Sequence, residues 1–287
     1  MPQLTDLGYI KDLCGRHGFR LSKSFGQNFI VNPGVCPRIA EGAGLHKGMD
    51  ALEIGPGIGV LTKELAARAG KVVTVELDER LPPLLKESLA GTDNVKLVMG
   101  DAMKLDLCAL AEKEFEGRPF AVCANLPYYI TSPLLMRLLE EGLPAENITV
   151  MVQKEAAQRI CAQPGTREAG AISLGVRYYA EPKLLFTVSP GSFFPPPKVT
   201  SAVIRLDVRK TPPVSSENKE EMFRVIKAAF SQRRKTAVNG ISAGLSLPKE
   251  AVTAAFEEAG VSPALRPEQL TLEAFAALAG SLRPKGL

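Results

Sequence analysis

Short apolar runs alternate with amphipathic segments between residues 49 and 153. The amphipathic segment at 59–70 places Val60, Leu61 and Leu65 on one helical face and ends at Gly70, a residue that suits a helix stop. Nearly all-apolar strands separated by such helices form parallel sheets that are buried on both faces. The pattern therefore predicts an α/β fold with strands at 51–55, 71–77, 95–100, 120–126 and 148–153.

The pattern changes after the fifth of these strands. Residues 154–162 and 171–180 have helical patterns, and two further strand-like runs follow at 184–190 and 201–208. The two runs are joined by a proline-rich loop, so we expect them to complete one edge of a seven-stranded, mostly parallel sheet.

The last part of the chain has no strand-like run. Residues 211–218 have the composition of a linker, and helical patterns continue from there to residue 282. We therefore predict a sheet domain over 1–208, with an N-terminal helical segment at 1–48, and a smaller all-helical domain over 209–287.

The composition is that of an ordinary globular protein, with 45% hydrophobic and 23% charged residues, which excludes extended disorder and fibrous repeats. The first residues lack the apolar core of a secretory signal, and no stretch approaches the ~18 uncharged apolar residues of a membrane span. The five cysteines include no Cys-x-x-Cys pair, and only two histidines are present to share a metal. We expect a cytoplasmic protein with reduced thiols, no metal and no membrane association, and nothing requires more than a monomer.

The charge is unevenly distributed. The net charge is +4, yet acidic and basic residues balance over 1–208, so the whole excess lies in 209–287. There Arg233, Arg234 and Lys235 end a basic run without an acid, and a second basic region near the start of the chain includes Lys23. One such run is usually a solvated helix face, but two runs around a neutral middle favour contacts with nucleic-acid phosphates.

A glycine-rich turn follows the first predicted strand. Gly55 and Gly57 precede a predicted helix, the place where open α/β sheets bind nucleotide-like ligands. The third glycine of the dinucleotide fingerprint is replaced by Val60, and the turn does not end in Gly-Lys-Ser/Thr. The turn therefore disfavours both NAD and a nucleoside triphosphate.

Carboxylates lie at or near the ends of the first three strands. Glu76 closes the second strand, where it can accept hydrogen bonds from ribose hydroxyls, and Asp101 closes the third, where it can accept one from an adenine amine. Glu53 precedes the glycine turn, beside the expected position of a cationic ligand group. Three carboxylates without a lysine suit a nucleoside with a positively charged tail, and S-adenosylmethionine has that chemistry. The alternative is that Glu76 and Asp101 only cap helices.

The fourth strand ends in a turn made of Asn125, Leu126, Pro127 and Tyr128. The amide oxygen of Asn125 and the carbonyl oxygen of Leu126 are placed to accept both N–H groups of an aromatic amine such as adenine N6, which directs its lone pair toward a methyl group. Tyr128 is expected to stack on the base and to stabilise positive charge.

A base that reacts in such a turn must leave its own stack, and a second aromatic ring is expected to cover its other face. Phe194, next to Phe193 and before three prolines, is the candidate for this contact. The alternative for this aromatic pair is a position in the hydrophobic core.

Seven motifs occur in the order that is typical of ribosomal RNA adenine dimethyltransferases, and the resemblance extends from about Leu21 to Leu282. They are KSFGQNFI (23–30), EIGPGIGVLT (53–62), VELD (75–78), GDA (100–102), NLPYYI (125–130), FFPPPKVTSAV (193–203) and QRRKT (232–236).

The resemblance implies a class I, Rossmann-like, S-adenosylmethionine-dependent methyltransferase. It adds Asn28 and Ile30 as cofactor contacts beside Gly55, Gly57, Glu76, Asp101 and Asn125. The sequence is most similar to the small-subunit branch of the family, which implies dimethylation of N6 in two adjacent adenosines of the 3′-terminal hairpin loop of 16S rRNA, within a pre-30S particle.

Three other functions remain open at this stage. Large-subunit (23S) rRNA adenine methyltransferases that confer macrolide resistance share the glycine turn and the NLPY-like motif. A non-catalytic ribosome assembly factor would keep the fold and the basic tail, and a DNA N6-adenine methyltransferase would share the chemistry of the turn.

Overall fold

The computed structural model describes residues 3–22, 26–214, 219–232 and 234–282. They form two compact units, of which the first comprises Met1–Ala157 and Glu181–Val208, and the second Gln158–Ala180 and Arg209–Leu287. No helix among the described residues is long and apolar enough to cross a membrane.

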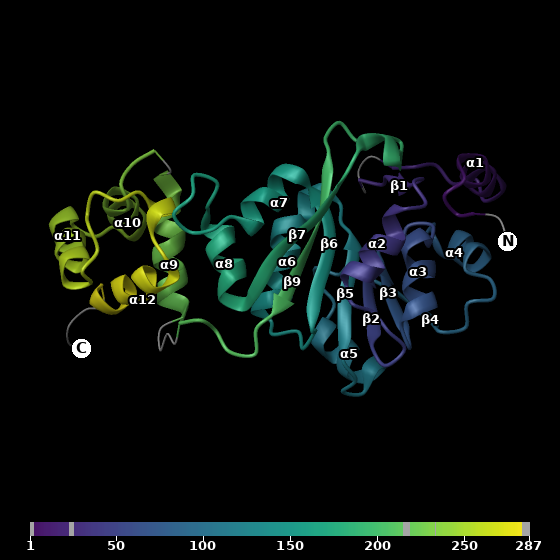
Figure 1. Cartoon of the computed structure of the whole chain (residues 1–287), viewed down its shortest axis with the longest axis horizontal. Coiled ribbons are helices and arrows are strands. Elements are labelled where there is room, and N and C mark those ends of the chain that lie inside the picture. Colours follow the sequence, from purple (N-terminus) through teal and green to yellow (C-terminus); the bar gives the residue numbers. More distant parts are fainter. Residues whose placement is uncertain (1–2, 23–25, 215–218, 233, 283–287) are drawn as a thin grey trace. The chain divides into compact units, whose positions relative to one another are not determined.

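The first unit is built on a seven-stranded sheet in the order β4-β3-β2-β5-β6-β9-β7 (Figure 1). Strands β2 to β6 pair in parallel, and β9 pairs antiparallel with β6. This confirms the predicted mostly parallel sheet and its seven strands. The bounds are β2 (Asp50–Ile54), β3 (Val72–Glu76), β4 (Val95–Met99), β5 (Phe120–Asn125), β6 (Asn147–Gln153), β7 (Ala180–Val188) and β9 (Ser201–Val208).

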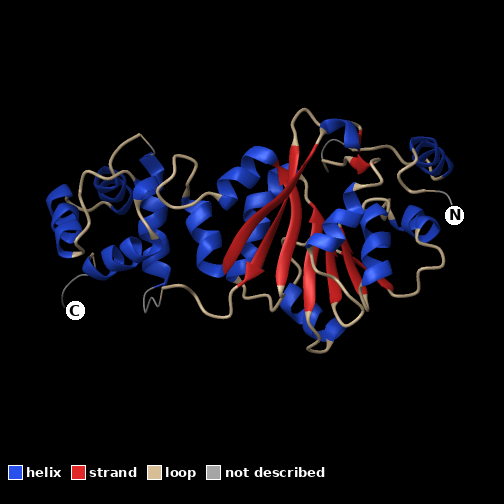
Figure 2. Cartoon of the chain, viewed as in Figure 1, coloured by secondary structure: helices blue, strands red, loops and turns tan. Residues whose placement is uncertain are grey.

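Helices pack around this sheet (Figure 2). Two of them begin at aspartates that accept a hydrogen bond from a backbone N–H of the first turn, Asp6 before α1 and Asp106 before α5. The bounds are α1 (Leu7–Arg16), α2 (Val35–Gly42), α3 (Val60–Arg68), α4 (Pro82–Ser88), α5 (Leu107–Phe115), α6 (Thr131–Glu140) and α7 (Lys154–Cys161).

The N-terminal segment is not purely helical, contrary to the prediction for 1–48. Strand β1 (Phe29–Ile30) pairs antiparallel with β8 (Phe193–Phe194), which follows the 3₁₀ turn Pro190–Ser192. Each strand has two residues, too few for a period-2 pattern to appear in the sequence. Pairing between distant segments defines them.

Apart from Ala180, the first residue of β7, the described residues of the second unit form helices and the loops between them. Besides the end of α7 it contains α8 (Ala171–Tyr179), α9 (Lys219–Ala229), α10 (Ala237–Leu245), α11 (Lys249–Glu258) and α12 (Leu272–Ser281). The predicted boundary at Val208 left residues 158–180 in the sheet domain. They belong with the second unit because Leu174 and Tyr178 of α8 are buried in one hydrophobic core with residues of α9, α10, α11 and α12.

Helices α9 and α10 pack at very short range through two glycines. A Cβ added to Gly240 would lie 2.5 Å from the carbonyl oxygen of Ala229, and one added to Gly244 would lie 2.7 Å from the Cβ of Ala228. Since a carbonyl oxygen of a helix cannot move without the helix, Gly240 sets the distance between these helices.

We predict that Gly240→Ala lowers the free energy of unfolding by about 1–3 kcal/mol, because the added methyl group overpacks the α9–α10 contact. Gly280→Ala in α12 is the matched control, since its Cβ would meet no atom within 4 Å. The free energy of unfolding of this control should rise by about 0.5–1 kcal/mol, because alanine is more favourable than glycine within a helix. Urea unfolding followed by circular dichroism measures both changes, and a Gly240→Ala chain as stable as the parent would contradict the packing argument.

Candidate functional site

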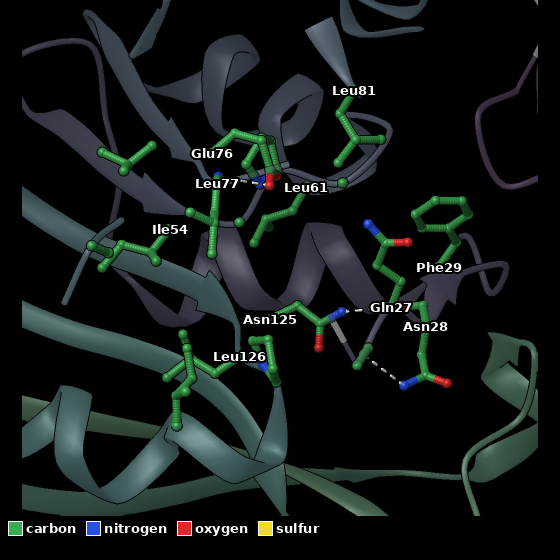
Figure 3. A pocket seen from close by; sticks show the side chains of 18 of the residues that line it. Gln27, Asn28, Phe29, Ile54, Leu61, Glu76, Leu77, Leu81, Asn125 and Leu126 are labelled. Carbon is green, nitrogen blue, oxygen red and sulfur yellow. Dashed lines mark hydrogen bonds between the residues drawn. The ribbon is translucent and has the colours of Figure 1, made fainter. Parts of the chain in front are cut away.

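A pocket in the first unit lies at the carboxyl ends of parallel strands β2, β3, β4 and β5 (Figure 3). The chain leaves β2 toward β3 on one side, while β5 lies on the other, so the strand order reverses at this point. Open α/β sheets bind ligands at such a reversal. Segment 26–30, which contains β1, also lines the pocket.

The glycine turn between β2 and α3 has two separate tasks. A Cβ at Gly55, where φ is 74°, would meet no atom within 4 Å, so the backbone there borders space for a ligand. A Cβ at Gly59, where φ is 87°, would lie 2.9 Å from Cδ2 of Leu89, so this glycine allows α3 to pack beside the end of α4. Gly57, between them, also lines the pocket.

Glu76 and Asp101 both line the pocket, as expected for strand-end acids. Oε1 of Glu76 accepts hydrogen bonds from the backbone N–H groups of Leu77 and Asp78, at 2.8 and 2.7 Å, which fixes the carboxylate. Burial raises the pKa of Glu76, and these two hydrogen bonds oppose the rise. Oδ1 of Asp101 accepts a hydrogen bond from the N–H of Met103 at 2.9 Å.

The loop after Asp101 is held by Arg137 of α6. Its guanidinium donates hydrogen bonds to the carbonyl oxygens of Ala102 and Leu105, and it also pairs with Glu141 on the same helix. These bonds connect the adenine-side wall of the predicted site to the helix that follows the NLPY turn. The sequence did not indicate this role for Arg137.

Asn125 and Asn28 are connected across the pocket (Figure 3). Nδ2 of Asn125 donates to the carbonyl oxygen of Asn28 at 3.4 Å, and Nδ2 of Asn28 donates to the carbonyl oxygen of Gly26 at 3.0 Å. The N-terminal segment therefore orients the amide at the end of β5. Ile30 lines the same pocket and is 4% exposed.

The rest of the NLPY turn also reaches the pocket. Leu126, Pro127 and Tyr128 all line it, and the hydroxyl of Tyr128 forms a 2.7 Å hydrogen bond with Oγ of Ser201, a buried residue of β9. This bond fixes the hydroxyl end of the Tyr128 ring, and the stacking role of the ring stays a prediction.

Of the two adjacent phenylalanines, Phe193 is the one that lines the pocket, and it is 4% exposed. Phe194 is absent from the described pocket lining. It is half-buried, and Nζ of Lys11 lies 5.6 Å from its ring centroid. Successive side chains of a strand point to opposite faces, which explains why the two rings separate. The stacking role of Phe194 stays a prediction.

Glu53 does not lie beside the ligand space as expected. Its side chain is fully buried, and Oε2 accepts a 2.7 Å hydrogen bond from Oγ1 of Thr62 in α3. Oε1 has no hydrogen-bond partner among the described residues. Burial raises the pKa of Glu53 to about 7, and the hydrogen bond from Thr62 opposes this rise. Glu53 therefore holds the first turn of α3 through Thr62 and does not face the ligand space.

A polar cluster that the sequence analysis missed holds the N-terminal segment to the sheet. Nε2 of Gln27 donates to Oδ2 of Asp78 at 2.8 Å, and Oε1 of Gln27 accepts from the N–H of Ser22 at 3.0 Å. Arg80 donates to both oxygens of Asp78, at 2.7 and 2.6 Å. Gln27 and Asp78 lie inside two of the motifs quoted above, KSFGQNFI and VELD, but nothing in the spacing of these motifs indicates that the two residues meet.

The predicted RNA-binding cations are only partly described. Lys23 and Arg233 lie outside the described residues, while Arg234 and Lys235 are exposed in the second unit.

The strand order and the pocket at the reversal of the sheet define a Rossmann-like class I methyltransferase fold. Similar solved structures include the following two. A dimethyladenosine transferase from Plasmodium falciparum has a TM-score of 0.72 and 25% identity, over 87% of this chain and 95% of that one. The 23S rRNA methyltransferase ErmE has a TM-score of 0.68 and 29% identity, over 89% of this chain and 99% of that one.

The family model described as ribosomal RNA adenine dimethylase matches residues 18–283. The chain belongs to this family. Relatives from Alkaliphilus oremlandii and Streptococcus pneumoniae, both named ribosomal RNA small subunit methyltransferase A, are 44% and 42% identical to it, each over 99% of this chain and 100% of the relative.

The buried Glu53 generates a prediction about pH. The unfolded chain loses this proton near pH 4.5 and the folded chain near pH 7, so the free energy of unfolding falls as the pH rises through this interval. Glu53→Gln removes this pH dependence. Above pH 7 the free energy of unfolding of the variant should exceed that of the parent by up to about 3 kcal/mol.

Urea unfolding between pH 5 and pH 8 measures the difference between Glu53→Gln and the parent chain. Glu79→Gln removes an exposed carboxylate of the same unit and serves as the control for the loss of one acidic residue. A Glu53→Gln difference that does not change with pH would contradict the buried-carboxyl interpretation.

Proposed function

We propose that this chain transfers methyl groups from S-adenosylmethionine to N6 of two adjacent adenosines in the 3′-terminal hairpin loop of 16S rRNA, and dimethylates each. The observation that carries the proposal is that the NLPY turn and the strand-end acids line one pocket. Family membership and the relatives named small subunit methyltransferase A support it.

The lining of the pocket fits S-adenosylmethionine. Among the described lining residues there is no lysine or arginine, which disfavours a phosphorylated ligand, while Glu76 and Asp101 offer carboxylates. The space above Gly55 admits close approach of a ligand to the backbone. When bound, this cofactor supplies a methyl group on a positively charged sulfur. We assign Asn28, Ile30, Gly55, Gly57, Glu76, Asp101 and Asn125 to its binding.

The amide orientation of Asn125 suits the substrate amine. Because Nδ2 donates to the carbonyl oxygen of Asn28, Oδ1 is the atom that accepts a hydrogen bond from adenine N6. The carbonyl oxygen of Leu126 accepts the second N–H, and Tyr128 stacks on the base. These contacts direct the nitrogen lone pair out of the ring system. With S-adenosylmethionine bound, this arrangement would present N6 to the methyl group, and the methylated nitrogen would release its proton to water.

We prefer 16S rRNA of the small subunit over 23S rRNA as the substrate. The curated relatives named for the small subunit are 44% and 42% identical over nearly the whole chain, whereas the 23S rRNA methyltransferase structure is 29% identical over 89% of it. A role as an assembly factor is compatible with catalysis. The partner we propose is a pre-30S particle in the cytoplasm, bound by a monomer of the enzyme.

The substrate proposal predicts which RNA accepts methyl groups. With labelled S-adenosylmethionine, unmethylated 30S particles should gain N6,N6-dimethyladenosine in 16S rRNA, and protein-free 23S rRNA and adenine-containing DNA should gain none. Asn125→Ala should lower transfer by at least about 100-fold, because an acceptor for the N6 hydrogens is lost, while particle binding is retained. Mass spectrometry of digested RNA provides the measurement. Methylation of 23S rRNA in place of the particle would overturn the substrate assignment.

The basic residues of the second unit predict a salt effect. Replacing both Arg234 and Lys235 by glutamine should make the negative slope of log affinity against log salt shallower by about 1.5. Each phosphate contact contributes about 0.7–0.9 to the magnitude of this slope. Lys86 and Lys113, two exposed lysines of α4 and α5, provide a charge-matched control pair. Filter binding to 30S particles at several salt concentrations measures the slope. Equal slopes for both double variants would show that Arg234 and Lys235 lie on a solvated surface.

A further inference from the structure

Tyr129 is the most exposed of the large apolar and aromatic side chains that stand out on the described surface, at 62%. It lies in the 3₁₀ turn Tyr128–Ile130, directly after the NLPY motif, and it lines the pocket. Most large aromatic side chains of a protein are at least partly buried, so a ring that is mostly in water at the mouth of a substrate pocket requires an explanation.

One edge of the Tyr129 ring faces the N-terminal segment at Gly26. A Cβ added to Gly26 would lie 3.6 Å from Cε1 of Tyr129 and 3.2 Å from Cβ of Pro127, so the ring edge rests close to the backbone of the N-terminal segment. Gly26 has a φ of 60°, and a larger residue would press against this contact. A tyrosine side chain has few rotatable bonds, so it loses little conformational freedom when a ligand covers it.

The two neighbouring tyrosines are held differently. The hydroxyl of Tyr128 is bonded to the buried Ser201, whereas that of Tyr129 has no hydrogen-bond partner among the described residues. The hydroxyl group of Tyr129 therefore does not position the residue. The exposed ring is the part of Tyr129 that can contact a ligand.

We infer that Tyr129 is a stacking site for a second nucleobase, the neighbour of the adenosine that enters the pocket. This inference rests on the proposed function and extends it. A base that leaves its stack deprives its neighbour of a stacking partner, and an aromatic ring at the pocket mouth replaces that partner. Base–aromatic stacking tolerates any base, so this site holds the strand without reading its sequence.

Steady-state kinetics on unmethylated 30S particles test the inference. Tyr129→Ala should raise KM for the particle about tenfold, with kcat and KM for S-adenosylmethionine within about twofold of the parent. Tyr129→Phe keeps the ring and should restore the parent KM. Leu184→Ala removes another exposed side chain of the first unit, 43% exposed on β7, and should leave all constants unchanged.

A fluorescence experiment distinguishes failure of this inference from failure of the proposed function. The chain contains no tryptophan, so Tyr129→Trp introduces a single reporter. A synthetic RNA hairpin with the two adenosines should quench its emission, and the same hairpin with an abasic site beside the target should quench much less.

Three outcomes would overturn the stacking site. They are an unchanged KM in Tyr129→Ala, a selective loss of cofactor affinity in that variant, and equal quenching by the two hairpins. If the parent chain transfers no methyl group while the quenching difference persists, the proposed reaction fails and the stacking site stands.

Discussion

The pairing of β1 with β8 is the interaction on which the site depends. It joins Phe29 and Ile30 to Phe194 and Phe193, and it continues through the N–H of Val31, which donates to the carbonyl oxygen of Ser192 at 2.8 Å. The parallel sheet alone would supply Glu76, Asp101 and Asn125 along one edge. The β1–β8 pairing adds the N-terminal segment, which orients the amide of Asn125 and borders the ring of Tyr129.

The sequence predicted the sheet well because its signal is local. Each of the five parallel strands lies within one or two residues of its predicted bounds, since buried strands are uninterrupted apolar runs between glycines and polar residues. Glu76, Asp101 and Asn125 were found by the same logic, because parallel strands present their carboxyl ends at one edge. Residues 158–180 were misassigned, since a helix pattern does not reveal which core the helix joins.

The features that the sequence did not reveal depend on tertiary contacts. Gln27 meets Asp78 across 51 residues, and neither residue type carries a periodic signal. Glu53 was expected to face the ligand because it precedes the glycine turn. It faces α3 because alternate residues of a strand point to opposite sides, and the buried Thr62 accounts for only one of its two oxygens. Such a carboxyl is held in place by its neighbours despite an unfavourable free energy of burial.

In the proposed function, the division of charge between the two units separates affinity for RNA from recognition of the base. Residues 158–180 carry Arg159, Arg167 and Arg177 against Glu168, so their place in the second unit makes that unit more basic than the sequence boundary implied. Phosphate contacts strengthen RNA binding but carry no information about bases. Because the described pocket lining has no cation, discrimination of adenine must come from hydrogen-bond acceptors and ring faces at the sheet edge. Asn125, Leu126 and Tyr128 supply these in the proposed mechanism, which makes the orientation of one amide more important to specificity than the net charge of the chain.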